Sequence, residues 1–344
     1  MQSAMKILIA PDSFKGCLPA REVAAVLGAA VRERHPDWEV VELPLADGGE
    51  GTLDVLAAAL GGEIRTAQVF DPLGRPVRAR FGLAGGTAVV EVAEACGLQL
   101  LRPEERDPLR ATTRGVGELL LAARAAGATH FLVGLGGTAT CDGGSGMLEV
   151  QGLRKALKDC KIEMLSDVDN PLVGPTGAAR VFAPQKGASP AAVAVLERRL
   201  EAQADALCAL TGRDVRRLPG AGAAGGLGAA FLACFDAACV RGIDRVLAAV
   251  GFEKHLLGAD LVVTGEGKSD SQTLQGKVPF GVLRHAGSVP VVLLSGRIED
   301  RDALAAAGFS RLVQASPAGL PTAEAIQAKT AAENLRRSIL SIIP

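Results

Sequence analysis

A glycine-rich segment in the middle of the chain carries the strongest chemical signal. It reads Gly136-Gly137-Thr138-Ala139-Thr140-Cys141-Asp142-Gly143-Gly144-Ser145-Gly146 and follows the apolar run 131–135, which predicts a strand. Glycine leaves backbone N–H groups uncovered and permits positive φ, so a turn of this composition can wrap an anion. The threonine hydroxyls add polar contacts, and Asp142 supplies a carboxylate that could hold a metal ion or accept a proton.

Two further turns combine glycines with carboxylates after predicted strands. They read Asp47-Gly48-Gly49-Glu50-Gly51-Thr52 and Gly265-Glu266-Gly267-Lys268-Ser269-Asp270. Any one such turn is explained about equally well as a structural turn with an N-cap and as part of a functional site. Three of them in one chain favour a functional interpretation.

These residue types are the ones that phosphoryl transfer requires. The reaction needs N–H donors and cations around the phosphates, carboxylates for Mg²⁺, and a base or aligning group for the acceptor hydroxyl. Lys15 follows the first predicted strand in the run Asp12-Ser13-Phe14-Lys15, and Lys186 lies in a proline-rich turn. For Lys186, a solvated surface lysine is the alternative interpretation.

Other sequence motifs for nucleotide chemistry are missing. Gly267-Lys268-Ser269 resembles the end of a Walker A loop, but Val262 stands where that motif begins with glycine. No GxGxxG follows the first strand, which counts against a nicotinamide-linked oxidoreductase. The four histidines lack the spacing of metal ligands, and no nearby histidine supports Cys141 as a nucleophile.

Composition excludes several other classes of partner. The 344 residues contain 37 Lys and Arg against 38 Asp and Glu, which argues against nucleic acid or an anionic membrane. Aromatic residues make up only 3%, so platforms for stacking bases are few. The seven cysteines form no CxxC pair, which suits a reducing compartment. We expect a cytoplasmic protein without a signal peptide or membrane span.

The elements that must position these residues alternate between strand and helix at both ends of the chain. The predicted strands cover 6–10, 39–45, 261–264, 290–294 and 311–314, and the early helices cover 20–34 and 53–60. This rhythm indicates a parallel sheet flanked by helices. If the strand order is 2-1-3-4-5, the ends of the first and third strands border one crevice. Asp12 and Lys15 would then face Glu266 and Asp270.

The middle of the chain has a different pattern. Residues 63–92 form short β-rich pieces separated by turn sequences, which predict antiparallel pairing. Further elements are predicted as helices over 114–126 and 190–210 and strands over 130–135 and 161–165. We therefore expect an α/β protein with an inserted α/β domain, residues 64–239. The outer domain is then discontinuous and consists of residues 1–63 and 240–344.

Seven blocks of the sequence together resemble the bacterial type I glycerate kinases. In chain order they are Ala10–Lys15, Ala46–Thr52, Gly136–Gly144, Asp169–Leu172, Pro184–Ala188, Pro219–Gly226 and Thr264–Gly267. The similarity runs from about Met5 to near the C-terminus. It is specific because seven separate blocks agree, and no single block is diagnostic.

The resemblance implies ATP- and Mg²⁺-dependent phosphorylation of D-glycerate to 2- or 3-phosphoglycerate. It also implies a flavodoxin-like doubly wound domain into which a second α/β domain is inserted. The expected partners are therefore the small molecules D-glycerate and ATP, and the protein could form an oligomer. A non-catalytic small-acid binding protein and a hydroxyacid oxidoreductase are the alternatives.

Two positions depart from the family pattern. Lys268 stands where the family usually has arginine, which keeps the charge but loses the bidentate fork. Family members also carry a few tens of residues between the helix after the glycine-rich turn and the next strand. Here 147–151 runs almost directly into 152–155, so the inserted domain is shortened near 150–154. This shortening is the main argument for the binding-protein alternative.

The site hypothesis assigns roles by residue type. Backbone N–H groups and hydroxyls would bind anionic oxygens at Ser13, Asp47, Gly48, Gly49, Glu50, Thr52, Gly136, Gly137, Thr138 and Thr140. Lys15 and Lys186 would neutralise phosphate or carboxylate charge. The candidates for holding Mg²⁺ or accepting the hydroxyl proton are Asp12, Asp142 and Asp167. Glu266 and Asp270 would form the opposite wall, and the assignment of groups to ATP or glycerate stays open.

Overall fold

The computed structural model describes residues 4–344, which form two compact units. Unit 1 combines the chain up to Asp47 with Ile243–Pro344, and unit 2 covers Gly48–Gly242. The first division therefore lies before helix α2 (Thr52–Ala59), not at residue 63, because α2 packs on strands of unit 2.

Unit 1 is built on a five-stranded parallel sheet. Its strands are β1 (Lys6–Ile9), β2 (Glu39–Glu42), β9 (Leu261–Thr264), β11 (Val291–Ser295) and β13 (Arg311–Gln314). They lie in the order β13-β11-β9-β1-β2. In chain order this is 2-1-3-4-5, so the strand order reverses between β1 and β9. A short parallel pair, β10 (Lys268–Ser269) and β12 (Arg297–Ile298), follows β9 and β11.

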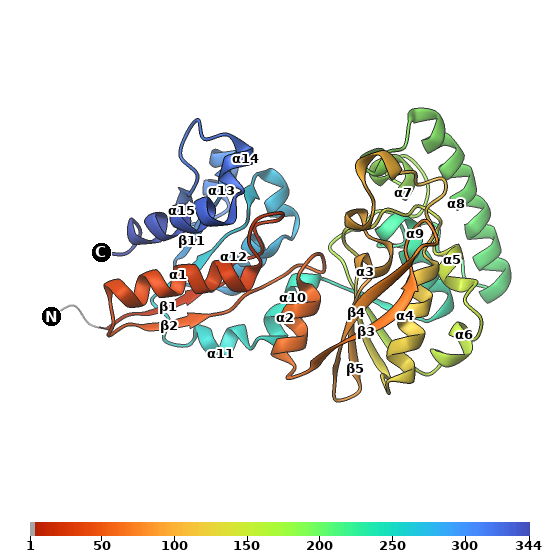
Figure 1. Ribbon diagram of the computed structural model, residues 1–344, viewed down its shortest axis with the longest axis horizontal. Coiled ribbons are helices and arrows are strands. Elements are labelled where there is room, and N and C mark those ends of the chain that lie inside the picture. Colours follow the sequence, from red (N-terminus) through yellow and green to blue (C-terminus); the bar gives the residue numbers. More distant parts are fainter. Residues whose placement is uncertain (1–3) are drawn as a thin grey trace. The chain divides into compact units, whose positions relative to one another are not determined.

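Helices cover the sheet of unit 1 because their apolar residues recur on one face. In α1 (Ala20–Arg34) the buried residues include Val23, Leu27 and Val31, which are spaced one helical turn apart. This face packs with α15 (Ala328–Leu340), and the two helices lie side by side in Figure 1. The other helices are α10 (Gly242–Ala249), α11 (Phe252–Leu256), α12 (Val278–His285), α13 (Arg301–Ala306) and α14 (Thr322–Ala325).

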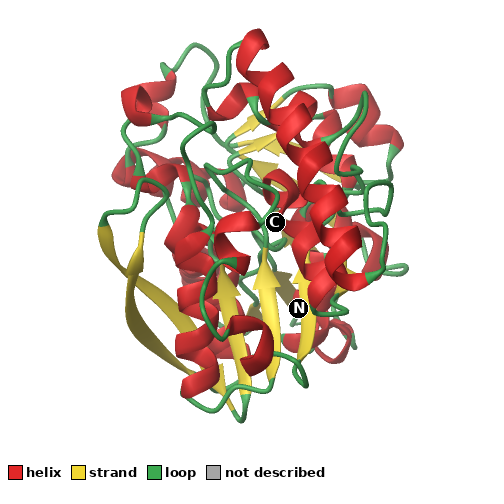
Figure 2. Ribbon diagram, turned by 90° about the vertical axis from the view of Figure 1, so that its right-hand side faces the viewer, coloured by secondary structure: helices red, strands yellow, loops and turns green. Residues whose placement is uncertain are grey.

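Unit 2 contains a six-stranded mixed sheet. Its strands are β3 (Glu63–Phe70), β4 (Pro76–Ala84), β5 (Thr87–Glu91), β6 (His130–Gly134), β7 (Lys161–Leu165) and β8 (Ala238–Val240), paired in chain order. The first two pairings are antiparallel, as predicted for 63–92, and the remaining three are parallel. Figure 2 shows strands in yellow between helices in red, with loops gathered beyond the arrowheads.

The helices of unit 2 enclose one hydrophobic core around Phe131 and Phe231, both fully buried. Besides α2 they are α3 (Ala93–Cys96), α4 (Arg114–Ala125), α5 (Ser145–Leu148), α6 (Leu153–Ala156), α7 (Ala178–Phe182), α8 (Pro190–Thr211) and α9 (Ala223–Cys234). Within residues 4–344, no helix combines the length and apolarity needed to span a bilayer.

The shortened connection between β6 and β7 leaves this core well packed. The side chains of Met147, Leu153 and Leu157 are fully buried within it. Strands β6 and β7 pair along their whole length, from His130 opposite Lys161 to Gly134 opposite Leu165. The short helices α5 and α6 therefore lie in the connection from β6 to β7 and contribute side chains to the core.

Candidate functional site

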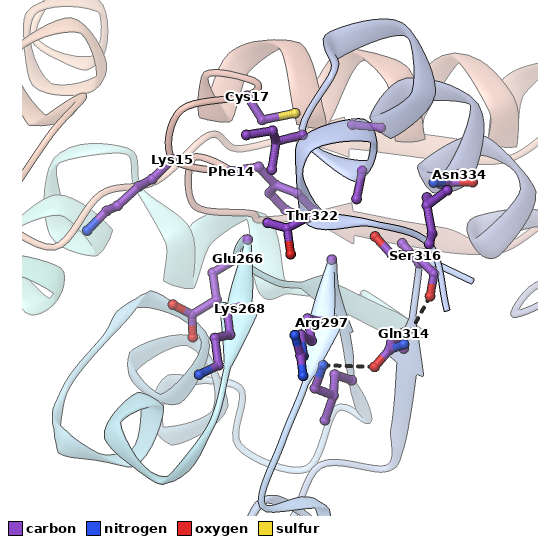
Figure 3. A pocket seen from close by; sticks show the side chains of 18 of the residues that line it. Phe14, Lys15, Cys17, Glu266, Lys268, Arg297, Gln314, Ser316, Thr322 and Asn334 are labelled. Carbon is purple, nitrogen blue, oxygen red and sulfur yellow. Dashed lines mark hydrogen bonds between the residues drawn. The ribbon is translucent and has the colours of Figure 1, made fainter. Parts of the chain in front are cut away.

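A cleft of about 1040 Å³ lies beyond the carboxyl ends of the unit 1 strands. The loops that follow β1, β9, β11 and β13 line it (Figure 3). Open parallel sheets bind ligands at this edge, next to the point where the strand order reverses. Five residues of the site hypothesis line the cleft: Asp12, Ser13, Lys15, Glu266 and Asp270.

Asp12 is a buried carboxylate in this cleft, with only 3% of its surface exposed. Its Oδ1 accepts the backbone N–H of Ser13 at 2.7 Å. Burial raises the pKa of Asp12 well above its ordinary value, and the charge of Asp47 raises it further, while Lys15 acts in the opposite direction. The ionised form is therefore destabilised, and a cation bound beside it would relieve that cost.

Ser13 adds an unsatisfied hydroxyl beside Asp12. The residue is buried and lines the cleft, and its Oγ has no hydrogen-bond partner. A buried polar group without a partner costs about 1–3 kcal/mol. A ligand that bonds to this hydroxyl would remove the cost, which fits the anion-binding role predicted from sequence.

Glu266 is held by a buried hydrogen-bond network. Its Oε1 accepts the hydroxyls of Thr273 at 2.6 Å and Ser269 at 3.1 Å, and Lys277 Nζ lies 3.4 Å from Oε2. Burial raises the pKa of Glu266, and the Thr273 hydroxyl opposes that rise. Lys277 also lines the cleft, a cation that the sequence hypothesis did not include. The pair Gly276-Lys277, a lysine directly after a glycine, was its signal in the sequence.

The rim of the cleft carries paired charges. Lys268 Nζ lies 2.8 Å from Glu299 and 3.4 Å from Asp270, and half of the Lys268 side chain is exposed. Asp270 also accepts the N–H of Gln272 and so caps the 3₁₀ turn Ser271–Gln275. The structure thus gives Asp270 a turn-forming role at the wall of the cleft.

Backbone contact between two glycine-containing loops forms one side of the cleft. Gly296 donates its N–H to the carbonyl oxygen of Glu266 at 3.2 Å. A Cβ on Gly296 would lie 2.6 Å from the carbonyl oxygen of Gly267, closer than side chains approach. Glycine at 296 is therefore required for the loops after β9 and β11 to pack together.

In unit 2 the remaining glycine turns meet at the carboxyl edge of the sheet. Gly136 donates its N–H to the carbonyl oxygen of Gly48 at 3.3 Å, and Gly48 donates to Thr52 Oγ1 at 3.1 Å. A Cβ on Gly136 would lie 2.6 Å from Cα of Gly49. These glycines therefore serve close backbone packing, in addition to any exposure of N–H groups. Gly137 lies in the left-handed region at φ 74°.

The hydrogen bonds of Asp142 favour a positioning role instead of the catalytic role expected from sequence. Its Oδ2 accepts the N–H and the hydroxyl of Thr113 at 2.8 and 2.9 Å and the N–H of Gly146 at 3.2 Å. Its Oδ1 accepts the N–H of Gly144 at 3.1 Å. A carboxylate is an acceptor only, and these donors already occupy it. Asp142 therefore fixes the glycine-rich turn instead of offering open oxygens to Mg²⁺.

Lys186 is buried, so the interpretation as a solvated lysine is wrong. Only 3% of its surface is exposed, and Nζ donates to Thr138 Oγ1 at 2.9 Å and to the carbonyl oxygen of Thr140 at 2.7 Å. Burial lowers its pKa. Lys186 thus ties down the turn 138–140, and the proline-rich sequence around it gave no sign of this burial.

Glu91 is a buried acid at this edge that the sequence hypothesis missed. It ends β5, and its Oε1 accepts the N–H of Leu53, in the first turn of α2, at 2.6 Å. Burial raises its pKa to about 7. A single glutamate at the end of an apolar strand was the only signal in the sequence.

The other predicted residues differ in exposure. Thr52 and Thr140 are buried, and Glu50 is exposed. Asp47 and Asp167 are half-buried, and Asp167 follows β7. The boundary between the units falls within the block 47–52. Asp47 belongs to unit 1, where its charge acts on Asp12, whereas Gly48 packs in unit 2.

The acidic residues around Asp12 fit the Mg²⁺ implied by the resemblance. Among residues 4–344, no group of three or more His, Cys, Asp and Glu side chains is arranged as a metal site. Asp12 with Asp47 nevertheless offers two acidic groups whose mutual repulsion raises the pKa of Asp12. Mg²⁺ often binds through one or two carboxylates together with substrate phosphates. The pair therefore fits an ion that binds together with a phosphate ligand.

Comparison with known proteins accounts for this combination of motifs. The model of the glycerate kinase family matches residues 7–154 and 148–343. The chain belongs to the glycerate kinase family. The two matched segments overlap at residues 148–154, next to the shortened connection of this glycerate kinase family member.

Relatives in this family are similar over most of the chain. The glycerate 2-kinase of Escherichia coli K12 is 44% identical over 328 residues, which cover 86% of each chain. The glycerate kinase of Bacillus subtilis 168 is 43% identical over 371 residues, which cover 98% of this chain and 97% of the relative. A crystal structure described as glycerate kinase 2 from Salmonella typhimurium LT2 is 40% identical with a TM-score of 0.84, covering 99% of this chain and 97% of the other.

Proposed function

We propose that this protein is an ATP-dependent kinase that phosphorylates D-glycerate. One observation carries the proposal: family membership extends over nearly the whole chain and includes the block Ala10–Lys15, whose acidic and basic residues line the unit 1 cleft. The E. coli relative is named a glycerate 2-kinase, so we propose the 2-hydroxyl as acceptor and 2-phosphoglycerate as product.

Asp12 and Asp47 are the proposed holders of Mg²⁺. When bound, Mg²⁺ would neutralise negative charge on the phosphates during transfer. The support is the burial of Asp12 in the cleft together with the nearby negative charge of Asp47, both of which raise the pKa of Asp12.

Lys15 and Lys277 are the proposed cations for the transferred phosphoryl group. Lys277 lies beside Glu266 and lines the same cleft as Lys15. Fixed positive charges that face developing negative charge lower the barrier to phosphoryl transfer. The Ser13 hydroxyl, which lacks a partner, would donate to a phosphate oxygen.

The turns of unit 2 are proposed to bind anionic oxygens through backbone N–H groups. Asp142 and Lys186 hold the segment 138–146 from two sides, so its N–H groups need little reorganisation when an anion binds. We keep Asp167 in the proposed site because it follows a parallel strand at the same edge.

A coupled assay for ADP release tests this function. With ATP, Mg²⁺ and D-glycerate we expect sustained ADP release, and without glycerate only a background rate. Phosphorus and carbon NMR of the product should show the phosphoryl group on the 2-oxygen. ADP release that does not depend on glycerate would refute the proposal, and a 3-phosphorylated product would refute its regiochemistry.

The binding-protein alternative makes a different prediction. It expects glycerate to raise the melting temperature without any consumption of ATP. Its main argument was the shortened connection near 150–154, yet Met147 and Leu153 are fully buried in the core there. The structure therefore offers no sign of impairment at the shortening.

A further inference from the structure

We infer that the unit 1 cleft is the nucleotide site, with the base in an apolar part walled by α14 and α15 and the phosphates beside Asp12 and Lys15. The inference rests on the proposed function only for the class of nucleotide, an adenosine phosphate. It answers a question that sequence left open, namely which groups bind ATP.

The volume of the cleft is larger than glycerate alone requires. The cleft measures about 1040 Å³. Glycerate has about seven non-hydrogen atoms, which at about 30 Å³ each fill roughly 200 Å³. A pocket near the upper end of the usual range of about 300–1000 Å³ suits a much larger ligand, such as a nucleoside triphosphate.

The lining of the cleft is divided by chemistry. The apolar part is lined by Pro317, Leu320, Ala325, Ile326, Ala331 and Leu335. The charged residues of the lining are Asp12, Lys15, Glu266, Lys268, Asp270, Lys277, Arg297 and Glu299. Figure 3 shows Lys15 and Glu266 toward one end of the drawn side chains, and Gln314, Ser316 and Asn334 toward the other. An adenosine phosphate is divided in the same way, whereas glycerate has no apolar body to fill the first part.

Asn334 supplies a polar group within the apolar part. The residue lines the cleft from α15 with 5% of its surface exposed. Its Oδ1 accepts a hydrogen bond from Arg337, but its Nδ2 is buried without a partner. An acceptor on the base or ribose would satisfy this amide, as Ser13 Oγ would be satisfied at the phosphate end.

Gln314 stabilises a loop next to the apolar part of the cleft. Its Oε1 accepts the N–H of Ile298 at 3.1 Å, and its Nε2 donates to the carbonyl oxygen of Ser316 at 2.9 Å. Both ends of the amide are therefore occupied, so Gln314 fixes the loop that carries Pro317. Within the apolar part, the unpartnered donor is on Asn334.

The test is direct binding of ADP to variants that block the apolar part. Ala325→Trp places a large side chain in the cleft from α14, and Ala323→Trp is the matched control, since Ala323 is exposed on the same helix outside the lining. By calorimetry we expect Ala325→Trp to weaken ADP binding at least about tenfold and Ala323→Trp to stay within about twofold. D-glycerate binding should be unchanged in both.

Asn334→Asp provides a second variant that keeps the shape of the side chain. It retains an oxygen for Arg337 and replaces the amide donor by a second acceptor oxygen, which also carries negative charge, so we expect at least about fivefold weaker ADP binding. Wild-type affinity for ADP in both cleft variants would overturn the inference. So would absence of ADP binding by the wild type, or loss of glycerate binding instead of ADP binding.

The binding assay is independent of catalysis. The ADP titration contains no glycerate and involves no turnover. A protein that binds ADP through this cleft but releases no ADP from ATP with glycerate would refute the proposed function and leave the inference standing.

Discussion

Asp12 in unit 1 and Asp142 in unit 2 each follow a strand that pairs in parallel with its neighbours, and both lie in motif blocks of the same family, yet their environments are opposite. Asp142 accepts four hydrogen bonds from protein donors and is fully engaged in its turn. Asp12 accepts the N–H of Ser13, and burial and the charge of Asp47 raise its pKa. A satisfied carboxylate stabilises structure, whereas a destabilised one is available to bind or react.

Replacing Asp12 should separate activity from stability. We expect Asp12→Asn to lower kcat/KM at least about 100-fold, or about 2.7 kcal/mol of transition-state stabilisation. The folded pKa of Asp12 is raised, so its stability contribution is present at low pH and lost as pH rises. At neutral pH the neutral asparagine should therefore raise the melting temperature.

The matched control for Asp12→Asn is Asp37→Asn, since Asp37 is exposed in unit 1. It should leave both kcat/KM and melting temperature unchanged. A lower melting temperature for Asp12→Asn would show that Asp12 stabilises the fold, as Asp142 does. The proposed difference in role between the two aspartates would then be wrong.

Replacing Asp142 should lower the stability of the protein, in contrast to replacing Asp12. In Asp142→Asn one oxygen becomes an NH₂ group, which leaves at least one buried donor of the turn without an acceptor. We expect the free energy of unfolding to fall by about 2 to 3 kcal/mol in denaturant titration. If stability is unchanged while turnover falls 100-fold, Asp142 would be catalytic after all.

Glu91 makes the stability of unit 2 depend on pH. Its folded pKa is raised from 4.5 to about 7, so its contribution is fully present below pH 4.5 and is lost as pH rises through 7. Between pH 5 and pH 8 we expect this carboxyl to account for a loss of about 2 kcal/mol. Denaturant titrations at both values should show this loss in the wild type and not in Glu91→Gln. Equal pH dependence in the two proteins would contradict the assignment.

Lys268→Arg should have the smallest effect. The side chain is half exposed and pairs with Glu299 and Asp270 at the rim, where ion pairs contribute little. We expect kcat/KM to stay within about threefold when the arginine usual in the family is restored. A gain of tenfold or more would show that the bidentate fork of arginine matters for the reaction.

The sequence predicted the fold class and most elements because periodicity is a local property. The expected helix over 20–34 and the strands over 161–165, 261–264 and 311–314 have the same limits in the structure. The antiparallel pairing within 63–92 is confirmed as well. The boundary at 63 was wrong because the packing of α2 against β4 and β5 depends on contacts distant in sequence.

Site roles were harder to predict because they depend on which donors meet each side chain. Asp12 and Asp142 look alike in sequence, and only two of the four donors to Asp142, the N–H groups of Gly144 and Gly146, come from its own turn. Thr113 and Lys186 reach the same turn from distant segments. Glu91 became notable only when burial and the N–H of Leu53 were known.

The most direct test of the account is a glycerate-dependent ADP-release assay of the wild type and Asp12→Asn side by side, with melting temperatures of both. The account predicts sustained release by the wild type and at least about a 100-fold loss of kcat/KM in an Asp12→Asn protein that melts no lower. A wild type that releases no ADP with D-glycerate, or an Asp12→Asn variant with wild-type activity, would contradict it.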